Sequence, residues 1–101
     1  MLLTNYKEFG GKSNVSIIDS FNNDKYENQD IILDFMINEG EELSIGGIST
    51  DIITGEVIGN RVTKKSGIFV WSSDLEYYIS KYNYMPDKEF IDYVLNQIKT
   101  A

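Results

Sequence analysis

The stretch GIFVWSSDLEYYISKYNYMPDKEF, residues Gly67–Phe90, decides the fold. It opens with an apolar run that ends at Trp71, the only tryptophan of the chain, and continues into a segment with four tyrosines. The run Ile68–Trp71 does not alternate with polar residues, which predicts a strand that is central in its sheet or covered on both faces. Ser73 and Glu76 have the spacing of a capping box, so we predict that a helix begins just after Trp71.

Two helices are predicted to follow this strand. The first has apolar residues at positions i, i+3, i+4 and i+7, which form its buried stripe: Leu75, Tyr78, Ile79 and Tyr82. Pro86 suits the first turn of a second helix, and the acidic residues after it suit the positive end of the helix dipole. The predicted buried face of this second helix is Phe90, Ile91, Val94, Leu95 and Ile98. Tyr77 and Tyr84 lie outside these stripes, and we expect both to be exposed.

The preceding part of the chain predicts a helix and a small sheet. In YENQDIILDFMINEG the apolar residues recur at helical spacing, which predicts a helix from about Asn28 to Glu39 that stops at Gly40 in the left-handed conformation. The next segment is rich in β-branched residues, and turn formers divide it into short strands: Gly46-Gly47, Thr54-Gly55 and Lys65-Ser66-Gly67. Gly59 is expected at a β-bulge. The predicted fold class is α+β, with one helix, a small antiparallel β-meander of three to four strands, and two C-terminal helices packed on the sheet.

Residues 1–101 are expected to form a single α+β domain, because a chain of this length can bury one modest core. The first 25 residues are the hardest to interpret, and the motif VSIIDSF fits either a short helix or a short strand. The apolar runs are far shorter than the roughly 20 residues of a membrane span, and the start of the chain lacks the pattern of a signal peptide. We therefore expect a cytoplasmic protein with no membrane contact.

The composition excludes the commonest catalytic groups. The chain has no histidine and no cysteine, which removes the usual general base, the thiol nucleophile and thiolate zinc sites. A carboxylate pair such as Asp51 and Asp74 is the remaining alternative, although Asp74 is more simply a helix-start acid and Asp51 a turn residue. The segment Asp19–Asp30 is rich in oxygen ligands but lacks the glycine and the glutamate of a calcium loop. We predict no enzymatic activity, no metal site and no cofactor.

Charge is distributed unevenly along the chain. Between Asp19 and Glu56 there are ten acidic residues against the single base Lys25, whereas Arg61–Lys65 holds three bases and no acid. The formal net charge of −7 argues against nucleic acid as a partner, because phosphate binding relies on clustered Lys and Arg. A basic protein is an electrostatically easier partner, although net negative charge alone also keeps a small protein soluble.

The second half of the chain resembles a family of small uncharacterised bacterial proteins that end in the signature W-x-x-D-L-x-Y-Y-x-x-K-Y-N-x-x-P-x-x-F. The matching residues are Gly40, Thr50-Asp51, Thr54-Gly55, Val70-Trp71, Asp74-Leu75, Tyr77-Tyr78, Lys81-Tyr82-Asn83, Pro86 and Phe90. In this chain three residues, rather than two, separate the proline from the final phenylalanine. The similarity covers Tyr26 to Leu95. Some such proteins lie beside polymorphic toxin genes, so the resemblance implies a toxin-immunity role.

Two functional hypotheses follow. The first is a non-catalytic protein-binding domain, an acidic immunity-type inhibitor that covers a basic cleft of a toxin or effector. Its expected contacts are the acidic side chains and the exposed tyrosines: Asp34, Glu39, Glu41, Glu42, Asp51, Tyr77 and Tyr84. The alternative is a homo-oligomeric assembly module, in which a homodimer is held together by the sheet edge or by the tyrosine face. A carboxylate-based enzyme is a distant third.

Overall fold

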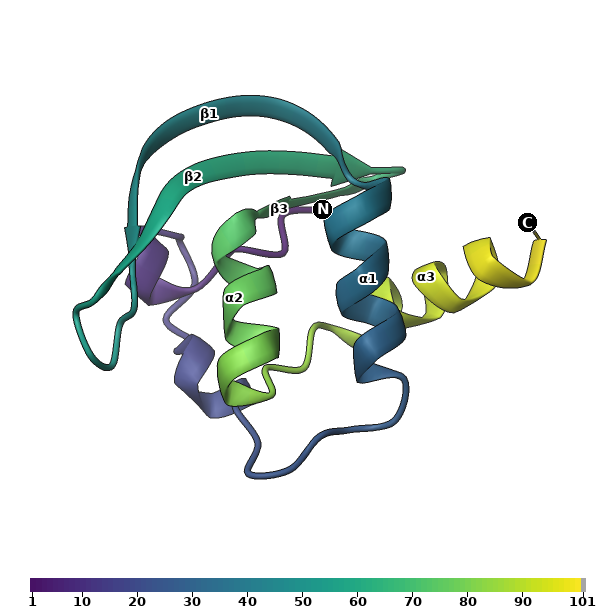
Figure 1. Cartoon of the computed structure of the whole chain (residues 1–101), viewed down its shortest axis with the longest axis horizontal. Coiled ribbons are helices and arrows are strands. Elements are labelled where there is room, and N and C mark those ends of the chain that lie inside the picture. The colour runs from purple at the N-terminus through teal and green to yellow at the C-terminus, as the bar shows by residue number, and fades with distance from the viewer. Residues whose placement is uncertain (101) are drawn as a thin grey trace.

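The fold is an arched antiparallel sheet above two helices, with a third helix that runs past α1 and away from the sheet (Figure 1). The computed structural model describes residues 1–100. Within them, the elements in chain order are the 3-10 helices η1 (Lys7–Phe9) and η2 (Ile17–Ser20), then α1 (Gln29–Glu39), β1 (Glu41–Thr50), β2 (Val57–Ser66), β3 (Phe69–Ser72), α2 (Ser73–Tyr82) and α3 (Lys88–Thr100). The predicted α+β class and the predicted order of elements are confirmed.

The three strands form a meander in the order β1-β2-β3, with both pairs antiparallel. Cross-strand partners run from Glu41 opposite Lys65 at one end of the β1–β2 pair to Thr50 opposite Val57 at the other. The predicted turns at Thr54-Gly55 and around Gly67 are both present, because these segments connect β1 to β2 and β2 to β3.

β3 is the last strand of the sheet rather than the central one. Its outer edge is nevertheless covered by the first residues of the chain: the Leu3 amide donates to the Val70 carbonyl at 2.8 Å, and the Val70 amide donates to the Met1 carbonyl at 2.8 Å. The prediction that the whole run from Ile68 is covered is wrong at its first residue, because Ile68 lies in the turn before β3 and is 70% exposed.

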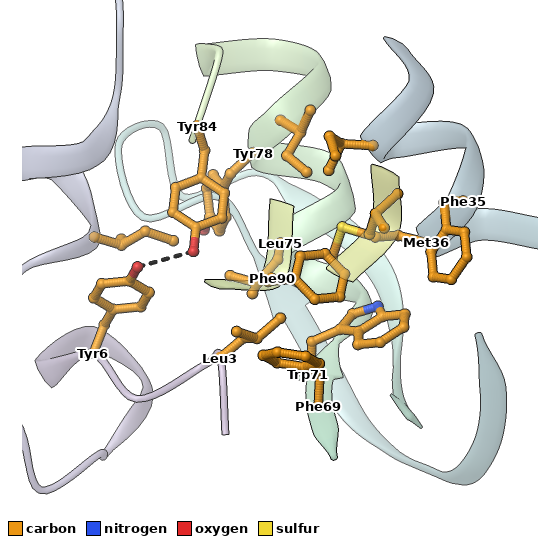
Figure 2. Close-up of a cluster of buried hydrophobic side chains, with 14 residues drawn as sticks. Leu3, Tyr6, Phe35, Met36, Phe69, Trp71, Leu75, Tyr78, Tyr84 and Phe90 are labelled. Carbon is orange, nitrogen blue, oxygen red and sulfur yellow. Dashed lines mark hydrogen bonds between the residues drawn. The ribbon is translucent and has the colours of Figure 1, made fainter. Parts of the chain in front are cut away.

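The core lies between β3 and the helices and includes the Trp71 ring (Figure 2). This ring is fully buried and packs against Phe90 of α3 at a centroid distance of 5.4 Å. Met36 of α1 and Leu75 of α2 are also fully buried. β3, α1, α2 and α3 thus each contribute apolar side chains to one cluster, whereas β1 and β2 contribute none of its buried members.

The N-terminal segment belongs to the same core. Its Leu3, Tyr6 and Ile17 are all buried, and the motif VSIIDSF contains the 3-10 helix η2. The hydroxyls of Tyr6 and Tyr84 lie 2.9 Å apart inside the fold, as the dashed line in Figure 2 shows. The expectation that Tyr84 is exposed is therefore wrong: a side chain 78 positions earlier covers it.

Gly40 ends α1 without adopting a left-handed conformation. Its φ is −70° and its ψ is 128°, so the predicted left-handed stop is wrong. The position needs glycine for lack of space: a Cβ atom there would lie 2.7 Å from the Trp71 ring and 2.9 Å from the Met36 carbonyl oxygen. The glycine allows the chain to pass directly under the tryptophan.

The first turn of α2 also differs from the prediction. The N-cap is Ser72, whose hydroxyl accepts from the Asp74 amide at 3.1 Å, whereas the Ser73 hydroxyl accepts from the Val62 amide of β2 at 3.0 Å. Glu76 binds the Trp71 indole N–H at 3.0 Å instead of completing a capping box. The predicted start of the helix is correct to within one residue, and the predicted box is wrong because tertiary contacts bind both of its side chains.

Candidate protein-binding surfaces

Asp51 organises the connection between β1 and β2. One carboxylate oxygen, Oδ1, accepts from the backbone amides of Ile53 at 2.7 Å and Thr54 at 3.0 Å. The Asp51 amide donates to the Glu56 carbonyl at 2.8 Å, and the Gly55 amide donates to the Asp51 carbonyl at 2.7 Å. This is the turn role expected of an aspartate before a loop, in which the side chain replaces backbone acceptors.

The other oxygen of Asp51 fastens this turn to α2. Oδ2 accepts from the Tyr77 hydroxyl at 2.6 Å and from the Tyr82 hydroxyl at 2.7 Å, and the Lys81 ammonium lies 3.8 Å away. Burial by itself would raise the pKa of Asp51, but the hydrogen bonds from the two tyrosines and the two turn amides outweigh it and hold this pKa well below its usual range. The same hydrogen bond to Asp51 raises the pKa of Tyr82 to about 12.

Asp74 joins the strands to the first turn of α2. Its Oδ1 accepts from the Ser49 hydroxyl of β1, and its Oδ2 accepts from Nε and Nη2 of Arg61 of β2 at 3.2 and 3.0 Å. Both oxygens are therefore bound by donors from the sheet. Asp51 and Asp74 belong to two separate networks, and each has the full set of partners expected of a structural carboxylate.

The basic stretch Arg61–Lys65 is neutralised within the fold. Arg61 pairs with Asp74 as described, Lys64 pairs with Glu76 at 3.0 Å, and Lys65 lies 3.9 Å from Glu41. The Lys64–Glu76 pair is largely covered, with side chains 10% and 12% exposed. As each base faces an acid, this stretch offers little positive potential to a partner, and the excess of negative charge is carried by other surfaces.

A groove between α1 and α3 carries part of that excess. It has a volume of about 480 Å³ and is lined by Asp30, Ile31, Asp34, Phe35, Glu39 and Ile98. Two rows of α1 side chains contribute to the groove. Residues 31, 35 and 39 form one row and residues 30 and 34 form the other, because side chains four positions apart are neighbours on a helix surface. Ile31 and Ile98 are 42% and 47% exposed, so the groove has an apolar floor that the fold leaves open.

The acidic residues of the groove are only partly neutralised. Asp30 pairs with Lys25 at 2.8 Å, but both side chains are well exposed. Asp34 accepts from the Asn38 side-chain amide at 2.7 Å, and neither Asp34 nor Glu39 forms an ion pair with any residue in the described range 1–100. No basic side chain lines the groove. Its chemistry, an apolar floor beside carboxylates, suits a ligand that is both apolar and positively charged.

The expected contact residues are therefore divided among several places. Asp34 and Glu39 lie in the groove, and Glu41 and Glu42 are exposed at the start of β1, just after α1. Asp51 is 1% exposed, Tyr84 is fully buried, and Tyr77 is half-buried with its hydroxyl bound to Asp51. Asp51 and Tyr84 are too deeply buried to contact a partner, and the hydroxyl of Tyr77 is already bound, so all three belong to the scaffold.

Sequence reasoning missed the apolar floor of the groove. Ile98 belongs to the predicted buried face of the last helix, and Ile31 is one of the apolar residues at helical spacing in the first, yet both are exposed. One signal was present: six of the eleven residues of α1 are large and apolar, which is more than a single buried stripe needs. A helix with that many apolar residues presents some of them outside the core.

No family model, curated protein or solved structure matches the chain in the comparisons with known proteins. The resemblance to small bacterial proteins therefore stays a prediction. Among residues 1–100, no helix is long and apolar enough to cross a membrane, and no cluster of three or more potential ligand side chains could hold a metal ion.

Proposed function

We propose that this chain is a non-catalytic protein-binding domain, an inhibitor of the immunity type, whose α1–α3 groove receives a basic and partly apolar segment of another protein. The observation that supports the proposal is the groove itself, where Asp34 and Glu39 lack ion-pair partners beside the exposed Ile31 and Ile98. Exposed carboxylates speed the encounter with a basic protein, and the apolar floor lengthens the lifetime of the complex.

The distribution of ion pairs supports the same function. The bases of β2 are bound by acids of the fold, so the net charge of −7 is not cancelled at the α1 surface. A basic partner therefore approaches this surface under attraction and meets no clustered positive charge in the groove. Asp51 and Asp74 hold the sheet on α2, and a rigid scaffold lowers the entropy that binding must offset.

The test begins with capture of the partner. The tagged protein is used to recover bound proteins from a lysate of its source organism at low salt and at about 0.5 M salt. We expect to recover one basic protein in a stoichiometric amount at low salt, and we expect high salt to release it from the tagged chain. Its association rate with the purified chain is then measured over the same range of salt, and a rate that does not change with salt would count against the charge argument.

A matched pair of variants locates the binding surface. Asp34→Asn with Glu39→Gln removes two charges from the groove, and Asp19→Asn with Asp24→Asn removes two charges from the exposed N-terminal segment. Only the first pair is expected to slow association, by roughly tenfold. Equal effects of both pairs would show that net charge alone matters and would refute the groove as the site.

A further inference from the structure

The outer edge of β1 is free of any strand partner within residues 1–100. β1 pairs with β2 on one side only, and of its ten residues only Ser49 is buried. The opposite edge of the sheet is already occupied, because Met1–Leu3 hydrogen-bond with β3. In Figure 1 the β1–β2 ribbon arches over the helices, so nothing in the fold covers this edge.

This edge lacks most of the features that keep sheet edges apart. Leu43, Ile45 and Ile48 are 49%, 68% and 57% exposed, and the strand contains no lysine and no proline. Exposed edges with apolar side chains pair readily with another strand, and proteins usually protect these edges with lysine or proline. The register of β1 against β2 shifts at three places, at Leu43, at Gly46-Gly47 and between Ser49 and Thr50, and such irregularities bend the ribbon.

The fold holds this edge in a fixed position. Ser49 of β1 and Arg61 of β2 both bind Asp74, and Asp51 fastens the end of the ribbon to α2. The strand is therefore exposed but held in place by the rest of the fold. Its pairing with another chain would cost little conformational entropy.

The charge pattern of the ribbon favours a second copy as the partner. β1 carries acids only at Glu41 and Glu42, and Glu41 lies 3.9 Å from Lys65 of β2, so its remaining residues, 43–50, bear no charge in a chain of −7. Two copies thus repel each other least at this surface. When two β1 strands run antiparallel, the acids of one lie beside Ser49 and Thr50 of the other, whereas a parallel arrangement would place acid against acid.

We propose that two copies of this chain pair antiparallel along β1, about a two-fold axis near Ile45 and Gly46, and join their sheets into one. The pairing closes at two copies because Met1–Leu3 already cover the far edge of each sheet. The dimer interface is separate from the α1–α3 groove, so the inference does not depend on the proposed inhibitory function.

Sedimentation equilibrium of the purified chain tests the proposal. The apparent mass is expected to rise from 11.6 kDa toward twice that value between about 10 μM and about 1 mM, as suits a small interface. Added salt should leave the dimer unchanged or strengthen it by screening the net repulsion, which is opposite in sign to its effect on a basic partner. A chain that stays monomeric up to about 1 mM would overturn the proposal.

Variants at Ile45 test the arrangement. Ile45→Lys and Ile45→Glu, which change an exposed side chain, are each expected to weaken the dimer at least tenfold, because like charges meet across the axis. An equimolar mixture of the two is expected to dimerise again. Ile68→Lys is the control, since Ile68 is as exposed but lies in the turn before β3. Equal weakening by the Ile45 and Ile68 variants, or no recovery in the mixture, would refute this pairing.

Discussion

At the scale of single residues, Asp51 shows how one carboxylate fixes a long β-ribbon. It accepts four hydrogen bonds, two from the backbone of its own turn and two from tyrosines of α2. A buried carboxylate is tolerated only when donors of this kind replace water. The conformation of the turn and the attachment of the ribbon therefore depend on the same side chain.

Asp51→Asn is expected to lower the free energy of unfolding by about 1–3 kcal/mol, because an amide has one acceptor oxygen and leaves donors of the turn or of α2 unpaired. Asp19→Asn, which changes an exposed side chain outside this network, should alter it by less than about 0.5 kcal/mol. Urea unfolding of the two variants measures the difference. Equal stability of both variants would contradict the structural role of Asp51.

The low pKa of Asp51 also predicts how stability depends on pH. This pKa is lower in the folded chain than its ordinary value of 3.8, so the ionised form stabilises the fold above pH 3.8. That contribution is lost progressively as the pH falls below this value and the carboxylate is protonated. Acid titration followed by circular dichroism should show a steeper loss of stability in the wild type than in Asp51→Asn. Parallel curves would count against the predicted shift.

Two glycines provide a matched test of packing. A Cβ atom at Gly40 would meet the Trp71 ring and the Met36 carbonyl, whereas one at Gly46 would meet nothing within 4 Å. Gly40→Ala is expected to lower the free energy of unfolding by about 1–3 kcal/mol, and Gly46→Ala by less than about 0.5 kcal/mol. Thermal unfolding, followed by the fluorescence of the single tryptophan, measures both. A stable Gly40→Ala variant would contradict the close approach.

At the scale of elements, α2 connects most of the molecule. Its first turn binds β1 and β2 through Asp74. Glu76 accepts from the Trp71 indole N–H and pairs with Lys64 of β2. At the C-terminal end of the helix, the Tyr82 hydroxyl donates to Asp51 of the β1–β2 turn. Such a helix must begin at a defined residue, since a shift of one position would rotate these side chains away from their partners. The cap at Ser72 therefore matters for the sheet as well as for the helix.

Ser72→Ala removes the cap and is expected to cost about 1 kcal/mol of stability, because the Asp74 amide loses its acceptor. The same substitution at Ser80, which is exposed within α2, should be neutral or slightly stabilising, since alanine favours helices. Urea unfolding distinguishes the two. If Ser80→Ala were the more damaging change, the assignment of Ser72 as the cap would be wrong.

The elements were predictable from sequence where local pattern determines them. The spacing of Leu75, Tyr78 and Ile79 predicts α2, and all three are fully buried. Where the reason lies in tertiary contacts, the sequence misleads: Gly40 has the pattern of a helix stop, but glycine is required there by the position of Trp71. The burial of Tyr84 depends on the distant Tyr6, and no local spacing could indicate that contact.

The candidate site was predictable only in part, for the same reason. The charge of the segment indicates Asp34 and Glu39 as contact residues, and both line the groove. Ile98 could not be selected, because its exposure depends on how far α3 extends past α1 (Figure 1). Charge along a chain indicates which kind of partner is favoured, whereas the position of a surface requires the packing of several elements.

At the scale of the whole molecule, the two proposed surfaces lie on different elements and differ in chemistry. The groove is formed by α1 and α3 and is acidic, while the dimer edge belongs to β1 and is nearly neutral over its central residues. If both proposals hold, a dimer presents two grooves, and a multivalent partner gains avidity from them. The two functions should therefore be separable by substitution.

The prediction is a double dissociation. Ile45→Lys should abolish dimerisation and leave the association rate of a monovalent basic partner within about twofold of wild type, because distant sites act independently. Asp34→Asn with Glu39→Gln should slow that association and leave the dimer intact. Sedimentation equilibrium and stopped-flow binding, applied to both variants at the same two salt concentrations, measure the four quantities. If Ile45→Lys also weakened partner binding strongly, β1 itself would be the contact surface, and the groove would lose its proposed role. If the groove variant dissociated the dimer instead, the pairing would involve α1 and the arrangement about Ile45 would be wrong.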